Sequence, residues 1–199
     1  MELLREYIKE SLSTANIAEL EGFFVPMLPY PSQGSEAELA DLHNTIHQHS
    51  NRKVPDELQE VSDTSMLKMF KQHLHNNGYP FDKAYLKSVK KMIKPTIKKL
   101  KFLYARPRPH AVANEWGIPW EGDYLDSAQT PSYPSGHTIQ AYVVGLVLTH
   151  QHPEEEENLL NIAEIVSQSR IDRGVHFQTD VDYGREIAYI LASQILEGV

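Results

Sequence analysis

The sequence lacks cysteine altogether. This absence excludes disulfide bonds, thiolate metal sites and cysteine nucleophiles, although it does not fix the cellular compartment. Long hydrophobic runs are missing as well, because the longest candidate, residues 141–148, is far too short to span a bilayer. Positive charge is also scarce: 19 lysines and arginines face 27 acidic residues, and the net charge is −8. The protein as a whole is therefore not built to bind nucleic acid.

Strand signals are almost absent too, so the sequence predicts an all-α fold. The length of 199 residues suits one compact domain over residues 1–199, since neither repeats nor a low-complexity linker divide the chain. Residues 1–10 mix acids and bases before any apolar stretch forms, unlike a secretory signal peptide. We therefore expect a cytoplasmic protein, or a periplasmic one if a leader has been removed.

Hydrophobic periodicity and capping signals predict helices along most of the chain. Ser35 is expected to cap a helix, with Glu38 at the capping-box position. The proline-rich segment 23–34 is expected to be extended, and the turn-rich segment 110–131 to form a loop over the site. The expected helices cover residues 2–20, 35–49, 56–75 (one helix or a pair), 81–103, 135–150, 154–170 and 181–197.

The helix expected over 81–103 separates two kinds of side chain. Lysines recur every three or four residues on one side, while apolar residues lie largely apart from them. Such a face could attract phosphorylated polymers or membranes, but we interpret it as a solvated face with one end feeding a functional site. The lysines are Lys83, Lys87, Lys90, Lys94, Lys98 and Lys101.

Three short segments concentrate the chemically active groups. They are Lys101-x6-Arg108-Pro109, Tyr133-Pro134-Ser135-Gly136-His137 and Ser169-Arg170-x5-His176-x3-Asp180. Together they offer three cations, two histidines, one carboxylate and a Ser-Gly turn. This set can neutralise an anionic phosphoryl group, attack it and protonate the leaving oxygen without a metal.

Each histidine has an expected role. His176 is the candidate nucleophile, whose neutral imidazole could attack phosphorus and form a phosphohistidine. Asp180 lies four residues later; if the segment is helical, its carboxylate can accept the other ring N–H and stabilise the developing imidazolium. His137 is the candidate general acid, which would protonate the leaving oxygen and then activate water as a base.

The remaining groups are candidates for holding the phosphate. Arg108 and Arg170 can grip its oxygens through bidentate guanidinium bonds, and Lys101 adds a compact charge. Ser135 can donate a hydroxyl hydrogen bond, and Gly136 lets the backbone approach the anion closely. A helix that starts near Ser135 would also direct its N–H groups and positive dipole end at the anion.

Each piece alone has a commoner explanation, since a single histidine is usually packed or at the surface and Pro-Ser-Gly is a common turn. Their joint occurrence favours a site. The register of the first segment stays open at this point, because Lys99-x6-Arg106-Pro107 has the same spacing. A metal site is not expected, because no clear set of further ligands accompanies the nearby histidines His43, His47 and His49.

All three segments resemble the signature of the type 2 phosphatidic acid phosphatase (PAP2) superfamily. The sequence most closely resembles the bacterial class A non-specific acid phosphatases, and this resemblance extends over most of residues 24–197. The superfamily also includes the vanadium haloperoxidases. The resemblance favours the Lys101/Arg108 register: class A enzymes often carry an arginine where Arg106 stands and a tyrosine where Tyr104 stands.

The resemblance implies a single-domain helical bundle of the PAP2/haloperoxidase type and metal-independent hydrolysis of small phosphomonoesters, with no cofactor. It also implies phosphotransfer to alcohols, an acidic pH preference, inhibition by vanadate and frequent homodimers. His110 departs from the class A pattern, in which phenylalanine is frequent. This departure leaves the choice of substrate open.

Two rival functions fit the same residues. In a vanadium-dependent haloperoxidase, vanadate would be a cofactor coordinated by His176, and His137 would assist peroxide; such enzymes are usually much larger. A non-catalytic helical protein could instead use the cradle to capture phosphate or a phosphorylated partner.

Overall fold

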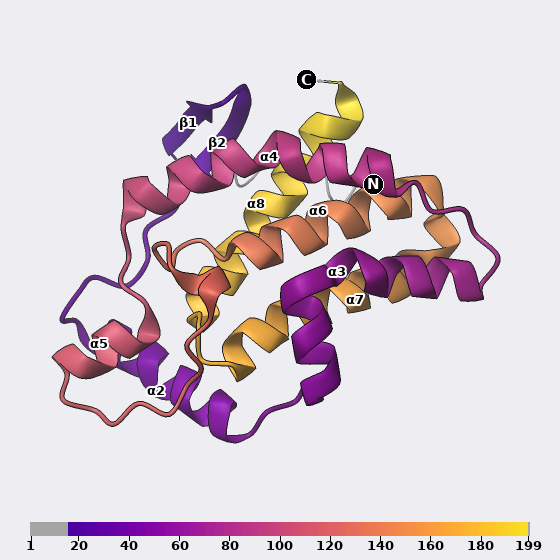
Figure 1. Cartoon of the computed structure of the whole chain (residues 1–199). Coiled ribbons are helices and arrows are strands. Elements are labelled where there is room, and N and C mark those ends of the chain that lie inside the picture. The colour runs from indigo at the N-terminus through magenta and orange to yellow at the C-terminus, as the bar shows by residue number, and fades with distance from the viewer. Residues whose placement is uncertain (1–15, 199) are drawn as a thin grey trace.

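The computed structural model describes residues 16–198 and is predominantly helical (Figure 1). Its helices are α2 (Glu36–Ser50), α3 (Asp56–Asn76), α4 (Lys83–Tyr104), α5 (Pro109–Glu115), α6 (Gly136–Gln151), α7 (Glu156–Asp172) and α8 (Gln178–Glu197). Two strands and two 3-10 helices complete the fold: β1 (Asn16–Leu20), β2 (Phe23–Met27), η1 (Asp126–Ala128) and η2 (Pro153–Glu155). The prediction of a helical fold is confirmed, with a small hairpin added.

The hairpin corrects the helix predicted over residues 2–20. Residues 16–20 form β1, which pairs antiparallel with β2 so that Leu20 faces Phe23; residues 2–15 lie outside the described part. Glu21 and Gly22 both have positive φ, 54° and 82°, which reverses the chain after Leu20. At the start of β2, Phe23 and Val25 are buried and Phe24 between them is exposed, which is the strand period rather than the helical one.

Helix α6 forms the centre of the core. Its residues 141–148 are all buried, as expected for a helix that is apolar on every side. Helices α7 and α8 pack against it, and α4 covers a further side (Figure 1). The first turn of α6 therefore lies among the three helices that carry the cationic and carboxylate residues predicted for the site.

Local signals explain where α2 and α3 begin and bend. Ser35 Oγ accepts from the backbone N–H of Glu38 at 3.1 Å, and Glu38 Oε2 accepts from Gly34 N–H at 2.8 Å, so the predicted capping residues do cap α2. Helix α3 contains a non-helical residue, Ser65 (φ −154°, ψ 44°), and Figure 1 shows the bend there. The alternative of a helix pair was therefore the better description of α3.

The segment predicted as a loop, 110–131, contains helix α5. Arg108 is its N-cap residue and Pro109 its first residue, a position where the fixed φ of proline suits a helix. The rest of the segment is irregular apart from η1. Helix α5 matters for the site because it fixes the backbone of Arg108.

Candidate active site

His176 lies in the turn between α7 and α8, with 2% of its side chain exposed. Its Nδ1 is 3.0 Å from Asp180 Oδ2, and its Nε2 is 3.0 Å from Arg108 Nη1. A guanidinium group only donates, so Nε2 accepts and the ring proton is on Nδ1, facing the carboxylate. Burial, and then the charge of Arg108, lower the pKa of His176 well below its ordinary value. The ring is thus neutral, with the Nε2 lone pair on the side of the cation.

Asp180 reaches His176 by a different geometry from the one predicted. Helix α8 starts at Gln178, so His176 lies before the helix and the two residues do not share a helical face. Asp180 instead folds back over the N-terminus of α8, where its Oδ2 also accepts from Phe177 N–H at 3.0 Å. The cap and the histidine contact therefore use the same carboxylate oxygen.

Further donors surround Asp180, which is fully buried. Arg106 Nη1 donates to its Oδ1 at 2.7 Å, and the Ser132 hydroxyl donates to its Oδ2. Burial opposes ionisation, but Arg106 and His176 outweigh it and hold the pKa of Asp180 well below its ordinary value. The second terminal nitrogen of Arg106, Nη2, donates to Asp41 Oδ2 on α2 at 3.0 Å. Asp180 is thus a fixed anion behind His176.

The two possible registers of the first segment occupy different environments. Lys99 is 54% exposed and pairs with Glu21 at the surface, while Arg106 is enclosed by carboxylates. Lys101 is buried, and its Nζ donates to the backbone oxygens of Pro131 at 2.6 Å and Ser132 at 3.2 Å. Arg108 is beside His176, as described above.

The Ser135-Gly136 turn lies against Lys101. Ser135 is the N-cap of α6, and its backbone N–H donates to Asp180 O at 2.9 Å, which ties the turn to α8. A Cβ at Gly136 would lie 3.3 Å from Ile97 Cγ2 and 3.5 Å from Lys101 Cε, so glycine lets the turn approach α4 closely. Burial, and then the charge of Arg108, lower the pKa of Lys101 to about 7. The N-terminus of α6 and Lys101 thus supply donors to one small region.

Arg170 and His137 meet at a residue that sequence reasoning missed, Asp63 on α3. Arg170 Nη1 donates to Asp63 Oδ1 at 2.5 Å, and His137 Nε2 is 3.5 Å from the same oxygen. Ser127 also donates to it at 2.6 Å. Within residues 16–198 the buried Arg170 Nε has no acceptor. No local motif marks Asp63; only the packing of α3 against α7 brings it here.

The contacts of Asp63 and His137 determine how these two residues ionise. Burial raises the pKa of Asp63, but the Ser127 hydrogen bond and the charges of Arg170 and His137 bring it below its ordinary value. For His137, burial and Arg170 lower the pKa well below 6.5, against the opposing effect of Asp63. The protein's own groups therefore favour a neutral His137 beside an ionised Asp63.

Metal-binding groups are not gathered in the described part of the chain: no three histidine, aspartate or glutamate side chains are placed to hold an ion. Of the three histidines weighed for such a site, His49 Nδ1 contacts the backbone oxygen of Asp172 at 2.7 Å and His47 contacts Asn51. The cationic groups near His176 suit an anion instead.

A protein-family model described as the PAP2 superfamily matches residues 91–197, more than half of the chain. The chain belongs to the PAP2 superfamily. The matched range contains all three segments, whereas Asp41 and Asp63 lie outside it.

Several curated relatives of this PAP2 chain are bacterial acid phosphatases. It is 36% identical over 87 residues to the non-specific acid phosphatase of Salmonella typhimurium, and this alignment covers 44% of this chain and 34% of the relative. It is 31% identical over 121 residues to that of Providencia stuartii, covering 56% and 48%. The acid phosphatase of Zymomonas mobilis is 28% identical over 176 residues, covering 84% and 65%. The chain thus spans about one third to two thirds of the length of these relatives.

A solved structure shares the PAP2 fold at low identity. The transmembrane PAP2 type phosphatidylglycerolphosphate phosphatase from Bacillus subtilis superposes with a TM-score of 0.56 and 19% identity, over 83% of this chain and 89% of that one. Among residues 16–198, by contrast, no helix has the length and apolarity needed to traverse a bilayer. The likeness therefore supports the helical fold of the family.

Proposed function

We propose that the protein hydrolyses phosphomonoesters without a metal, through a phosphohistidine on His176. The observation that carries the proposal is the setting of that ring: Asp180 accepts from Nδ1 while Arg108 donates toward Nε2. An unprotonated nitrogen beside a guanidinium group suits attack on a phosphoryl group whose oxygens that cation holds.

The first step would form a bond from His176 Nε2 to phosphorus and break the bond from phosphorus to the leaving oxygen. Asp180 would stabilise the positive charge that the imidazole gains. Arg108, Lys101 and Arg170 would hold the phosphoryl oxygens, with Arg170 Nε available for one of them. Ser135 and Gly136 would add the N-terminus of α6.

His137 would give its proton to the leaving oxygen in the first step and take one from water in the second. Burial and Arg170 lower the pKa of His137, whereas Asp63 favours its protonated ring. A bound phosphoryl dianion would favour the protonated ring as well, so substrate binding would raise this pKa. Water attack on phosphohistidine then releases phosphate and restores His176; an alcohol in place of water would give phosphotransfer. Vanadate would compete as a phosphate mimic.

Hydrolysis of p-nitrophenyl phosphate in the presence of EDTA tests this function. We expect turnover by the native chain, a loss of at least about 1,000-fold in kcat for His176→Ala, and a loss of about 100- to 10,000-fold for His137→Ala. The His137 loss should be larger for a poor leaving group, such as an alkyl phosphate, because that oxygen needs the proton more. His150→Ala, a surface histidine on α6, is the matched control and should keep full activity.

Three results would contradict the proposal. Normal turnover by folded His176→Ala protein would remove the nucleophile. Halide oxidation that appears only after vanadate is added would favour a haloperoxidase. Tight binding of inorganic phosphate with no turnover of any ester would favour a binding protein.

A further inference from the structure

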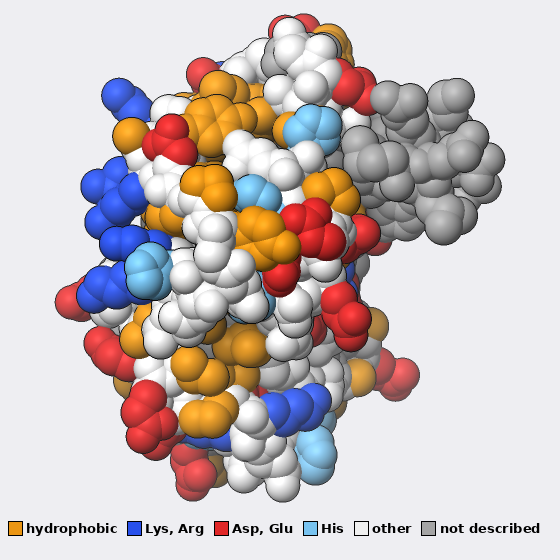
Figure 2. All heavy atoms as spheres, turned by 90° about the vertical axis from the view of Figure 1, so that its right-hand side faces the viewer, with side chains coloured by type: hydrophobic (Ala, Val, Ile, Leu, Met, Phe, Trp, Pro, Cys, Tyr) orange, Lys and Arg blue, Asp and Glu red, His pale blue; other side chains and the backbone are white. Residues whose placement is uncertain are grey.

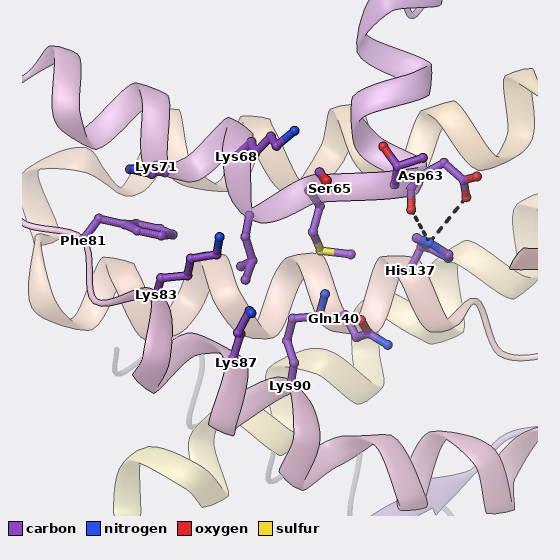
Figure 3. A pocket seen from close by; sticks show the side chains of 13 residues that line it. Asp63, Ser65, Lys68, Lys71, Phe81, Lys83, Lys87, Lys90, His137 and Gln140 are labelled. Atoms are coloured by element: carbon purple, nitrogen blue, oxygen red, sulfur yellow. Dashed lines mark hydrogen bonds and ion pairs between the residues drawn. The ribbon is translucent and has the colours of Figure 1, made fainter.

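A groove of about 450 Å³ opens beside His137, between the second half of α3 and the first half of α4 (Figure 3). Apolar side chains, among them Met66 and Phe81, form part of its wall. Five lysines from the two helices also line it: Lys68 and Lys71 from α3, and Lys83, Lys87 and Lys90 from α4. Asp63 and His137 lie together at one end of the groove (Figure 3).

The positive charge of this groove is balanced only in part within the described residues: Asp63 is the one carboxylate of its lining, and it pairs with Arg170. No aspartate or glutamate occurs within 64–81 or 83–114. The intervening Asp82 accepts from Tyr85 N–H at 2.9 Å as the N-cap of α4. Across residues 16–198 none of the five lysines forms an ion pair. Since the chain carries a net charge of −8, the groove is a local exception to an acidic protein.

The surface view agrees with this local character. Figure 2 shows blue side chains gathered along the left edge of the face, with a few acidic side chains among them and others spread over the remainder. A cluster of like charges in a concave wall raises the local concentration of small anions.

The groove lies on a defined side of the reacting group. His137 is part of its wall, whereas His176, Arg108 and Lys101 are not. In an in-line displacement the attacking and leaving atoms lie on opposite sides of phosphorus. With His176 as nucleophile and His137 as the acid, the groove would receive the leaving half of the substrate. Lys90 is near enough to His137 to lower the pKa of its ring, after the larger effects of burial and Arg170.

We propose that this lysine groove selects substrates whose leaving group carries a second phosphate, so that the preferred substrate is a small bisphosphorylated molecule. The inference rests on the proposed function, because it takes His137 as the leaving-group acid. Ammonium groups on both walls can contact a second phosphate as mobile point charges. The apolar wall would contact the carbon skeleton, and the volume suits a small organic ligand.

A matched pair of substrates tests the inference: glucose 6-phosphate and glucose 1,6-bisphosphate, with p-nitrophenyl phosphate as the reference. We expect kcat/KM of the native chain to be at least about tenfold higher for the bisphosphate. In Lys83→Gln/Lys87→Gln it should fall by about 3- to 20-fold for the bisphosphate, as expected for two partly exposed charge contacts. Turnover of p-nitrophenyl phosphate should change less than about twofold, and 0.5 M NaCl should reduce the bisphosphate preference because salt screens exposed charges.

Lys91→Gln/Lys98→Gln is the control, since it removes the same charge from exposed positions of α4 outside the groove. Equal kcat/KM for the two sugars, or equal losses in the groove and control variants, would overturn the inference while leaving the phosphatase intact. Hydrolysis of none of the three substrates would overturn the proposed function itself. Turnover of phosphatidic acid vesicles that depends on Lys83 and Lys87, without any preference for the bisphosphate, would also overturn the inference. It would indicate that these lysines bind a membrane surface instead.

Discussion

At the scale of single residues, Asp180 connects catalysis to folding. Its carboxylate accepts from His176, Arg106, Ser132 and the backbone of Phe177, and it has no exposed surface. The same charge therefore orients the proposed nucleophile, caps α8 and neutralises a buried arginine. Removing it should affect both activity and stability.

Asp180→Asn is expected to lower kcat by about 1,000- to 10,000-fold, because an amide cannot hold the same tautomer of His176 or stabilise its cation. It should also lower the free energy of unfolding by about 3 kcal/mol, since Arg106 loses a buried partner. Urea denaturation and steady-state kinetics measure the two effects. Asp182→Asn, an exposed carboxylate on α8, is the control. A fully active Asp180→Asn protein would refute the orienting role.

The ionisation of Lys101 should determine how kcat/KM decreases at alkaline pH. Its pKa is about 7, so the ammonium charge is present below that pH and is lost as the pH rises through it. We expect kcat/KM, which reports the free enzyme, to fall above about pH 7. In Lys101→Arg this fall should become shallower, because guanidinium stays charged while loss of the His137 proton still contributes. Lys99→Arg, the surface lysine of the other register, should keep it. An unchanged fall in Lys101→Arg would show that another group titrates.

At the scale of elements, the site depends on how closely α8 approaches the turn before α6. Gly184 of α8 lies against this turn, and a Cβ there would come within 3.1 Å of Ser135 O and 3.3 Å of Thr138 Cβ. Because Ser135 is also bonded to Asp180 through its backbone, this contact sets the distance between two of the predicted segments.

Gly184→Ala should push α8 away from the turn and lower the free energy of unfolding by about 1–3 kcal/mol, despite the better helix propensity of alanine. Activity should fall as well, because the Ser135 and His176 segments separate. Thermal unfolding and p-nitrophenyl phosphate kinetics would show both changes. Ser193→Ala, on the same helix away from the turn, should leave activity unaltered. A Gly184→Ala protein with native stability and rate would show that the contact is not tight.

Local signals predicted most elements of this fold, because caps, periodicity and Pro/Gly breaks act over a few residues. The capped start of α2 at Ser35 is one example. The failures have local reasons as well. The apolar spacing before Gly22 suited a helix, but the turn at Glu21-Gly22 pairs it with β2. For residues 110–131 the many turn-forming residues led to the prediction of a loop. Pro109 nevertheless favours the start of a helix, and α5 begins there.

At the scale of the whole molecule, the site draws on segments that sequence spacing cannot relate. The three motifs were recognisable because each has a fixed internal spacing. Asp41 and Asp63 were not, since they enter only through the packing of α2 and α3 onto the motif helices. The contact between His176 and Asp180 was predicted, but the helical geometry considered for it was wrong, because His176 precedes Gln178, the first residue of α8.

His176, which is buried, and His137, which is partly buried, should also make the whole protein acid-sensitive. The pKa of His137 and that of His176 are lowered in the fold, whereas the unfolded chain binds their protons as the pH falls through about 6.5. Stability therefore rises with pH in this region and is lost below it, at most about 1.4 kcal/mol per pH unit for each histidine.

Denaturation in phosphate-free buffer between pH 7 and 5 measures this dependence. His176→Asn and His137→Asn should each show a shallower loss of stability than the native chain, and the double variant the shallowest. Identical slopes in all four proteins would show that these rings do not control acid stability.

Trapping the phosphoenzyme tests the central claim most directly. The chain would be mixed with ³²P-labelled substrate, quenched in alkali within milliseconds and digested, and the labelled peptide identified by mass spectrometry. We predict alkali-stable, acid-labile phosphate on His176, formed and consumed as fast as turnover requires, and absent from His176→Ala. Label on any other residue, or turnover without label on His176, would contradict the account.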